Sequence, residues 1–187
     1  MSTQNPPTFI PSKVAKSDYP LIDNDPHFKR VVGYARPSDY AAGATAAAAG
    51  PGILLALEKF SPSYVGKGGF APAMRLCGGL GLVGGFLYFY TRSSLRFYGM
   101  SENQREIDMD MREMVAKVKA GEPLYGESRL TPNMQGVAAR QSRYSTLFMG
   151  AMPWFNFVNH NQHGIDTAKY YRQAERELEA ERNGGSA

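Results

Sequence analysis

Two long runs of uncharged residues constrain what this chain of 187 residues can fold into. Tyr40 to Leu57 comprises 18 consecutive uncharged residues, and Gly68 to Thr91 comprises 24 residues with a single charge, on Arg75. As helices, the runs would be about 27 Å and about 36 Å long, comparable to the roughly 30 Å hydrocarbon core of a bilayer. The pattern predicts an all-α membrane protein built on a two-helix transmembrane hairpin, with spans at about 40–57 and 68–91.

The first run is the weaker membrane candidate. It is rich in Ala and Gly, which contribute little transfer free energy, and Gly50, Pro51 and Gly52 would bend a helix. A soluble Ala-rich helix is therefore an alternative for this segment. The second run ends in aromatic residues at 86–90, which is typical of a membrane interface.

Basic residues border the two runs and predict how they meet the membrane. Arg75, Arg92 and Arg96 lie near the ends of the second run, where we expect them to anchor lipid headgroups. The connector at 58–67 is short enough to force a hairpin with both termini on one side. Six basic residues lie near the spans on that side against three at the connector. The positive-inside rule therefore favours the matrix or cytoplasmic side for both termini.

The residues before the hairpin, 1–39, contain six prolines. Because these prolines are spaced too closely for a long helix, they predict an extended N-terminal arm, with a flexible tail as the alternative. The first 20 residues lack the features of a secretory signal or of a cleavable mitochondrial presequence, so an address to an organelle would be internal.

The residues after the hairpin, 92–187, predict a polar C-terminal extension. Their amphipathic patterns, caps and stop signals indicate helices at about 101–120, 131–150 and 165–183. The stretch at 145–159 concentrates apolar and aromatic residues, among them Trp154 and Phe155. We expect these two side chains at an interface, either at the membrane surface or in a groove of a partner protein.

Glycines in the second run allow two interpretations. Gly79, Gly81 and Gly84 form the spacing G-x-G-x-x-G, which also occurs in dinucleotide-binding turns. Such a turn needs a preceding strand and an acidic residue about 20 positions later, and neither fits here. Helix packing is favoured instead, within the hairpin or against another protein. The small residues predicted to form the packing surface are Ala42, Ala46, Gly50, Gly78, Gly81 and Gly85.

The sequence predicts no catalytic, cofactor-binding or metal-ligating residue. His160 and His163 are close enough to share a metal, but two ligands do not make a site, and polar loop capping is the favoured alternative. Cys77 is the single cysteine and is expected to be an unreactive thiol. Lys and Arg do not form a patch with stacking aromatics, so no nucleic-acid partner is expected.

Two long stretches carry a resemblance to a known family. These are YPLIDNDPHFKRVVGYARPSDY at 19–40 and PWFNFVNHNQHGIDTAKYYRQAE at 153–175. With the hairpin between them, the chain resembles the fungal 21 kDa accessory subunit of mitochondrial NADH:ubiquinone oxidoreductase, respiratory complex I. The resemblance covers nearly the whole chain.

This resemblance implies a supernumerary subunit of the membrane arm that supports assembly and stability and carries no redox centre or nucleotide. It further implies the mitochondrial inner membrane as location, with other membrane-arm subunits and inner-membrane phospholipids, cardiolipin included, as partners. An independent small membrane scaffold or translocase-like factor is the alternative, and a nucleotide-binding enzyme is a more distant one.

Overall fold

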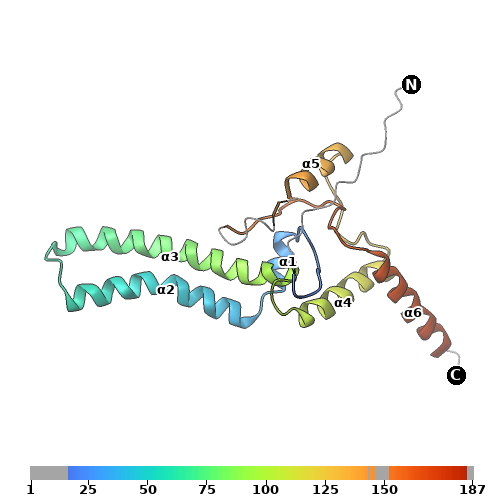
Figure 1. The fold of residues 1–187 in the computed structure, drawn as a ribbon, viewed down its shortest axis with the longest axis horizontal. Coiled ribbons are helices and arrows are strands. Elements are labelled where there is room, and N and C mark those ends of the chain that lie inside the picture. The colour runs from blue at the N-terminus through green and yellow to red at the C-terminus, as the bar shows by residue number, and fades with distance from the viewer. Residues whose placement is uncertain (1–16, 143, 146–151, 185–187) are drawn as a thin grey trace. The chain divides into compact units, whose positions relative to one another are not determined.

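The computed structural model describes residues 17–142, 144–145 and 152–184, without the side chains of Lys67 and Ala139. Within these ranges the chain is helical and forms no strand, which confirms the predicted all-α class. The chain divides into two compact units (Figure 1): unit 1 comprises Met1–Arg30 and Leu95–Ala187, and unit 2 comprises Val31–Ser94. The helices are α1 (Phe28–Gly33), α2 (Pro37–Phe60), α3 (Gly66–Phe97), α4 (Gln104–Ala120), α5 (Pro132–Ser142) and α6 (Ala168–Gly184).

Unit 2 is a hairpin of α2 and α3, which lie side by side (Figure 1). Both helices are long and apolar enough to cross a membrane, and only 6% of the apolar window of each is buried within the protein. Helices that pack against so little of their own chain must meet another apolar environment, because exposed apolar surface of this size is unfavourable in water. The hairpin therefore presents two candidate membrane spans.

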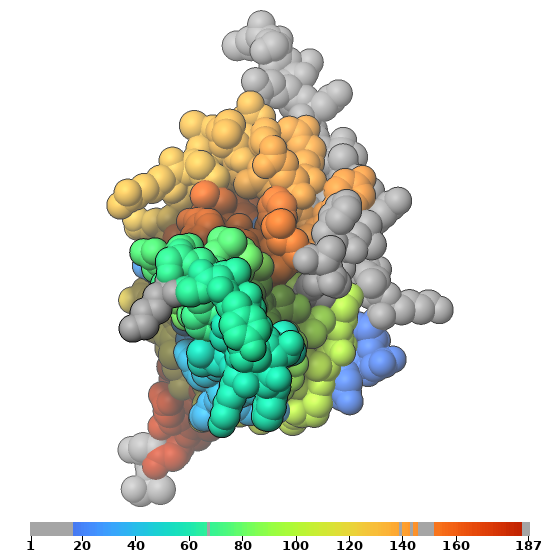
Figure 2. Space-filling model, turned by 90° about the vertical axis from the view of Figure 1, so that its left-hand side faces the viewer, coloured from blue at the N-terminus to red at the C-terminus, as the bar shows by residue number. Residues whose placement is uncertain are grey.

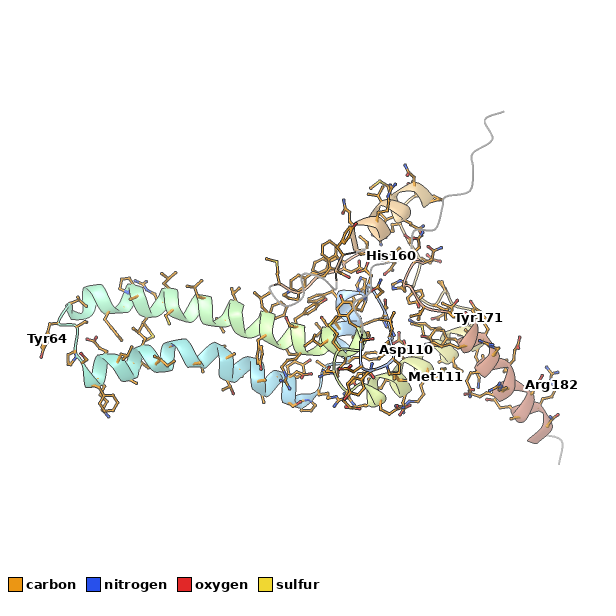
Figure 3. The ribbon with its side chains drawn as sticks, viewed as in Figure 1. Tyr64, Asp110, Met111, His160, Tyr171 and Arg182 are labelled. Carbon is orange, nitrogen blue, oxygen red and sulfur yellow. The ribbon has the colours of Figure 1, made fainter. Side chains whose placement is uncertain are left out.

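The hairpin turns at the connector between α2 and α3. Tyr64 has a φ of 57° and Gly66 a φ of 68°, and these left-handed conformations reverse the chain direction. The side chain of Tyr64 is 91% exposed at this end of the hairpin (Figure 3). Figure 2 views unit 2 from the connector end, which faces the reader.

The helices of the hairpin extend beyond the spans predicted from sequence. Pro37 occupies the first turn of α2, where a missing amide hydrogen costs no helical bond, and the Asp39 carboxylate accepts the Arg36 amide hydrogen at 2.8 Å. At the other end of the hairpin, α3 continues to Phe97. The hydroxyl of Ser94 donates to the Tyr90 carbonyl at 2.9 Å, which satisfies this polar side chain within the helix.

The N-terminal arm departs from the predicted extended structure. Residues 28–33 form α1, and α2 already begins at residue 37. Residues 17–26 form neither helix nor strand but are fixed against the protein, since Ile22 is 2% exposed and its amide donates a hydrogen bond to the Phe97 carbonyl at 3.0 Å. For these residues the alternative of a flexible tail is wrong. The first 16 residues lie outside the described residues.

The C-terminal extension contributes the core of unit 1. The helix α4 packs against α6 (Figure 1), and the buried side chains of Met114, Leu124 and Tyr170 form a cluster between these parts of the chain. Gly121 ends α4 in a left-handed conformation, with a φ of 70°. The predicted helix at 131–150 corresponds to α5, which ends at Ser142. Residues 143 and 146–150 of that prediction lie outside the described residues.

Candidate functional site

The first candidate site is the contact between α2 and α3. A methyl group on Gly81 would collide with the Ala47 carbonyl oxygen, and one on Gly85 would collide with the carbonyl of Gly43. A methyl group on Gly43 would lie 2.8 Å from Phe89 Cβ. The two backbones therefore touch, an approach that only glycine permits at these positions.

The other predicted packing residues differ in their surroundings. Gly50 faces α3, because a methyl group there would lie 3.2 Å from Cys77 Sγ. Together with Ala46, Gly50 also lines an open apolar groove of about 470 Å³ between the two helices. Ala42 is half-buried. A methyl group on Gly78 would meet no atom within 4 Å, so Gly78 takes no part in this contact.

Sequence reasoning missed two residues of the hairpin contact, Gly43 and Ala47. Gly43 is buried and supplies the carbonyl that meets Gly85, and Ala47 supplies both the carbonyl opposite Gly81 and a methyl group near Gly85. Both belong to the small-residue run of α2. Because small residues occupy nearly every position of that run, the sequence did not indicate which of its faces meets α3.

The predicted lipid anchors lie in three different environments. Arg75 is exposed on α3. Arg92 pairs with the buried carboxylate of Asp39, with Nε 3.2 Å from Oδ1, and its side chain remains 39% exposed. Arg96 is 5% exposed, and its Nε lies 3.4 Å from Glu106 Oε1. Burial and pairing with Glu106 do not favour contact between the Arg96 guanidinium and a headgroup, so its anchoring role stays a prediction that the fold does not support.

The second candidate site is a buried polar cluster in unit 1. It joins the N-terminal arm and α1 to α4 and to the segment before α6, and we call it the arm clasp. Asp110, on α4, is labelled in Figure 3 together with His160. The arm clasp consists of Asp23, Asp25, Arg30, Asp110, His160, His163 and Tyr170.

His163 is the charged centre of the arm clasp. Its Nδ1 lies 2.7 Å from Asp23 Oδ1, and its Nε2 lies 2.7 Å from the carbonyl oxygen of His160. Since both neighbours only accept hydrogen bonds, both ring nitrogens must donate, and the ring is an imidazolium. Burial alone would lower the pKa of His163, but the Asp23 carboxylate outweighs it and raises this pKa above 6.5.

The pKa of the partner carboxylate, Asp23, changes in the opposite direction. Burial alone would raise the pKa of Asp23, but His163 and the Arg30 guanidinium together lower it below 3.8. Arg30 Nη1 lies 3.2 Å from Asp23 Oδ2. The fold therefore holds Asp23 as a carboxylate between two cations, an arrangement that offsets the cost of burying these charges.

The second histidine is neutral in this arrangement. His160 Nδ1 accepts the amide hydrogen of Gln162 at 3.2 Å, so the ring proton resides on Nε2. This Nε2 donates to Asp25 Oδ2 at 2.7 Å. The side chain of Asn156 donates to the Asp25 backbone carbonyl at 3.0 Å. Residues 156–160 are thus fixed against the arm.

Arg30 connects the arm clasp to α4. Its Nη2 lies 2.5 Å from Asp110 Oδ1, and its Nε lies 3.4 Å from Glu113 Oε2. The hydroxyl of Tyr170 donates to the other carboxylate oxygen of Asp110. Burial raises the pKa of Asp110 and Arg30 opposes this shift. One guanidinium therefore holds α1 and α4 together through several acidic side chains.

The arm clasp predicts a pH optimum for the attachment of the arm. The contribution of His163 to the free energy that holds the arm is complete below pH 6.5. It is lost as the pH rises through the raised pKa of His163. The contribution of Asp23 is complete above pH 3.8 and is lost as the pH falls through its lowered pKa. We expect the slowest hydrogen exchange at residues 17–26 between these values, after correction for intrinsic rates. In the variant His163→Gln, residues 17–26 should no longer lose protection as the pH rises into the alkaline range. If the variant loses protection at the same pH as the unmodified chain, His163 is not the titrating group.

Both histidines of the pair considered for a metal are engaged in hydrogen bonds of the arm clasp. Both imidazoles bind carboxylates of the arm, and the described part of the chain contains no group of three or more His, Cys, Asp or Glu side chains that could hold a metal ion. The carboxylate partners were missed from sequence. Asp23 and His163 are 140 positions apart, and no local pattern links residues at such a separation.

The third candidate site is a cluster of aromatic rings in unit 1. Phe28, at the start of α1, lies 5.1 Å from Phe157 and 6.3 Å from Phe155, measured between ring centroids. The Phe28 amide donates to the Asn156 carbonyl at 2.7 Å, which fixes the two segments to each other. Trp154 is 38% exposed and Phe157 is 65% exposed. This surface is apolar, aromatic and accessible.

Comparisons with known proteins cover both units. Residues 16–102 match the family model described as NADH-ubiquinone oxidoreductase complex I, 21 kDa subunit. Residues 111–187 match the model described as the C-terminal part of the NADH-ubiquinone oxidoreductase 21 kDa subunit. The chain is also 70% identical to the NADH-ubiquinone oxidoreductase 20.9 kDa subunit of Neurospora crassa over 184 residues, covering 98% of this chain and 97% of that protein.

Proposed function

Because the chain belongs to the family of the 21 kDa subunit of NADH-ubiquinone oxidoreductase, complex I, we propose that it serves as a non-catalytic accessory subunit of the membrane arm. Family membership makes it a subunit of this oxidoreductase in the mitochondrial inner membrane, with other complex I subunits as partners. The proposed role is to support assembly and stability of the enzyme.

The observation that carries this proposal is the outward-facing hairpin. Two apolar helices contact each other through glycine backbone, yet the described residues bury only 6% of the apolar window of each helix. Helix association in a membrane depends on close packing and internal hydrogen bonds, since lipid is as apolar as the side chains. A helix pair of this kind is suited to lie against the helices of a larger membrane protein.

The polar groups of unit 1 support a structural role over a catalytic one. His160 and His163 are buried and hydrogen-bonded to carboxylates and to backbone, so neither ring is available as a base for a substrate. The arm clasp instead gives unit 1 a defined surface. This surface would contact neighbouring subunits outside the hydrocarbon core.

Topology and lipid contacts are part of the proposal. The excess of basic residues beside the N-terminal start of α2 and after α3 favours both termini on the matrix side. Arg75 and Arg92 would contact phospholipid headgroups, cardiolipin included, because both side chains remain exposed enough to reach them. Protease treatment of mitoplasts should leave a C-terminal tag intact, and should remove it only after the inner membrane is opened. Cleavage in intact mitoplasts would place the C-terminus on the other side.

The direct test of the proposed function is a native gel of mitochondrial membranes. We expect the tagged chain to co-migrate with NADH dehydrogenase activity, and deletion of the chain to reduce the amount of the assembled membrane arm. A chain that runs only at low mass would instead indicate an independent membrane scaffold. Full assembly in the deletion strain would contradict the assembly role while leaving membership of the complex intact.

A further inference from the structure

A cavity in unit 1 adjoins the aromatic rings and has a basic lining. Its volume is about 250 Å³, and Lys29, Arg30, Lys117 and His163 are among its lining residues. No Asp or Glu is among the described residues that line it. The carboxylates that balance Arg30 and His163 approach these groups outside the cavity lining, so an anion inside would face cationic groups first.

Lys29 supplies the free charge of this cavity. Arg30 and Lys117 are held by carboxylates, with Lys117 Nζ 2.7 Å from Glu113 Oε1. Lys29 is exposed, and its ammonium forms no hydrogen bond or ion pair with the described residues. An ammonium that is not already paired can bind an incoming anion without breaking an existing interaction.

The rim of the same cavity is apolar on one side. Val158 lines the cavity and is 38% exposed, and the adjacent Phe157 is 65% exposed. Phe28 precedes Lys29 in the chain and its ring contacts that of Phe157. We call the surface formed by Phe28, Phe155, Phe157 and Val158 the aromatic patch. Aromatic side chains next to basic groups are typical of proteins at the boundary between headgroups and acyl chains.

Lys29 is close in sequence to the first candidate membrane span. Lys29 precedes Pro37, the first residue of α2, by eight positions. A ligand that combines an anionic group with an apolar body would match both the basic cavity and the apolar side chains beside it.

We propose that this cavity and the aromatic patch together form a binding site for an anionic phospholipid. The headgroup phosphate lies in the cavity beside Lys29, and the glycerol and upper acyl segments lie on Phe157 and Val158. The inference rests on the proposed function, because it requires the chain to reside in the inner membrane. It differs from the headgroup contacts of Arg75 and Arg92, which lie in unit 2.

Trp154 provides the readout, because it is the only tryptophan of the chain, is 38% exposed and directly precedes Phe155 of the aromatic patch. The full chain is reconstituted into phosphatidylcholine nanodiscs that contain increasing fractions of acyl-brominated phosphatidylglycerol, which quenches tryptophan on contact. Brominated phosphatidylcholine in unbrominated phosphatidylcholine is the reference. We expect quenching by the anionic lipid to saturate at a low mole fraction, and quenching by the zwitterionic lipid to rise only in proportion to its amount.

Variants separate the site from general lipid contact. Lys29→Gln should raise the mole fraction for half-maximal quenching about fivefold, the effect expected for one basic residue near an anionic headgroup, and Lys29→Arg should restore it. Lys119→Gln is the matched control, since Lys119 forms ion pairs with Glu177 and Glu181 and does not line the cavity. Equal quenching by the two lipids, or equal effects of Lys29→Gln and Lys119→Gln, would overturn the proposal.

Two further measurements complete the test. Relief of quenching by millimolar inorganic phosphate would show that the cavity takes free phosphate, which would overturn the assignment to a lipid. The native gel of Lys29→Gln mitochondria should still show co-migration with NADH dehydrogenase activity. If the anionic lipid shows no saturable quenching in nanodiscs while this gel is normal, the lipid site alone is refuted. If the unmodified chain does not co-migrate with NADH dehydrogenase activity, the proposed function is refuted.

Discussion

Replacement of Gly81 by leucine is expected to reduce the amount of assembled membrane arm by roughly tenfold or more. A side chain at this position would occupy the space of the Ala47 carbonyl oxygen, and overpacking of this kind costs about 1–3 kcal/mol in a well-packed contact. The helices α2 and α3 would have to separate, which changes the surface offered to neighbouring subunits. Native gels of mitochondrial membranes measure the assembled fraction.

The matched control for this variant is Gly79→Leu on the same helix. Gly79 is exposed, and a methyl group there meets no atom within 4 Å. Both variants add the same apolar side chain to α3 and affect its helical propensity equally. NADH oxidation by the peripheral arm, assayed with an artificial acceptor, should persist in both. Equal assembly of the two variants would remove Gly81 from the packing role.

Replacement of Arg30 by leucine is expected to release the N-terminal arm. This change leaves the carboxylates of Asp23 and Asp110 without their shared cation, and both are almost fully buried. Loss of one partner from a buried ion pair costs about 3–5 kcal/mol when the remaining charge is left uncompensated. This cost applies to Asp110, because Asp23 keeps its ion pair with His163. Hydrogen exchange at residues 17–26 of the full chain in detergent should accelerate by at least about a hundredfold, since each 1.4 kcal/mol corresponds to a factor of ten.

A second arginine provides the control for the arm clasp. Arg112 lies exposed on α4 and donates to the backbone carbonyl of Asp108 at 3.1 Å. Arg112→Leu removes the same charge but should change exchange in the arm by less than about twofold, as is usual for surface substitutions. If Arg30→Leu leaves the protection of residues 17–26 unchanged, the arm is held by its backbone contacts with α3 and the arm clasp is dispensable.

The two histidines illustrate the limit of local sequence patterns. Their spacing in VNHNQHG was compatible with a metal-binding pair and with polar capping of a loop. It did not indicate that Asp23 and Asp25 are their partners. These partners come from the opposite end of the chain, and their approach depends on the packing of the arm against the residues before α6. A buried cation and its distant carboxylate become partners only when the chain has folded. Neither residue of the pair can therefore be identified from its local sequence.

The arginines that follow the second uncharged run, Gly68 to Thr91, also show the limit of local sequence patterns. Arg92 and Arg96 are both typical of a membrane boundary by sequence, since both follow an apolar run with aromatic residues. In the structure α3 continues to Phe97, and Arg96 is buried beside Glu106, whereas Arg92 remains partly exposed beside Asp39. Helical periodicity alone did not separate them, because the neighbours that bury Arg96 come from other segments of the chain.

The sequence by itself determined that this chain is all-α and contains two candidate membrane helices, because the length and apolarity of a span are properties of contiguous residues. It also contained the stretches by which the complex I family is identified. Only the tertiary structure decided which glycines touch a neighbouring backbone and how the arm is held. A contact between Gly85 and Gly43, or between Asp23 and His163, depends on the relative position of segments far apart in the chain.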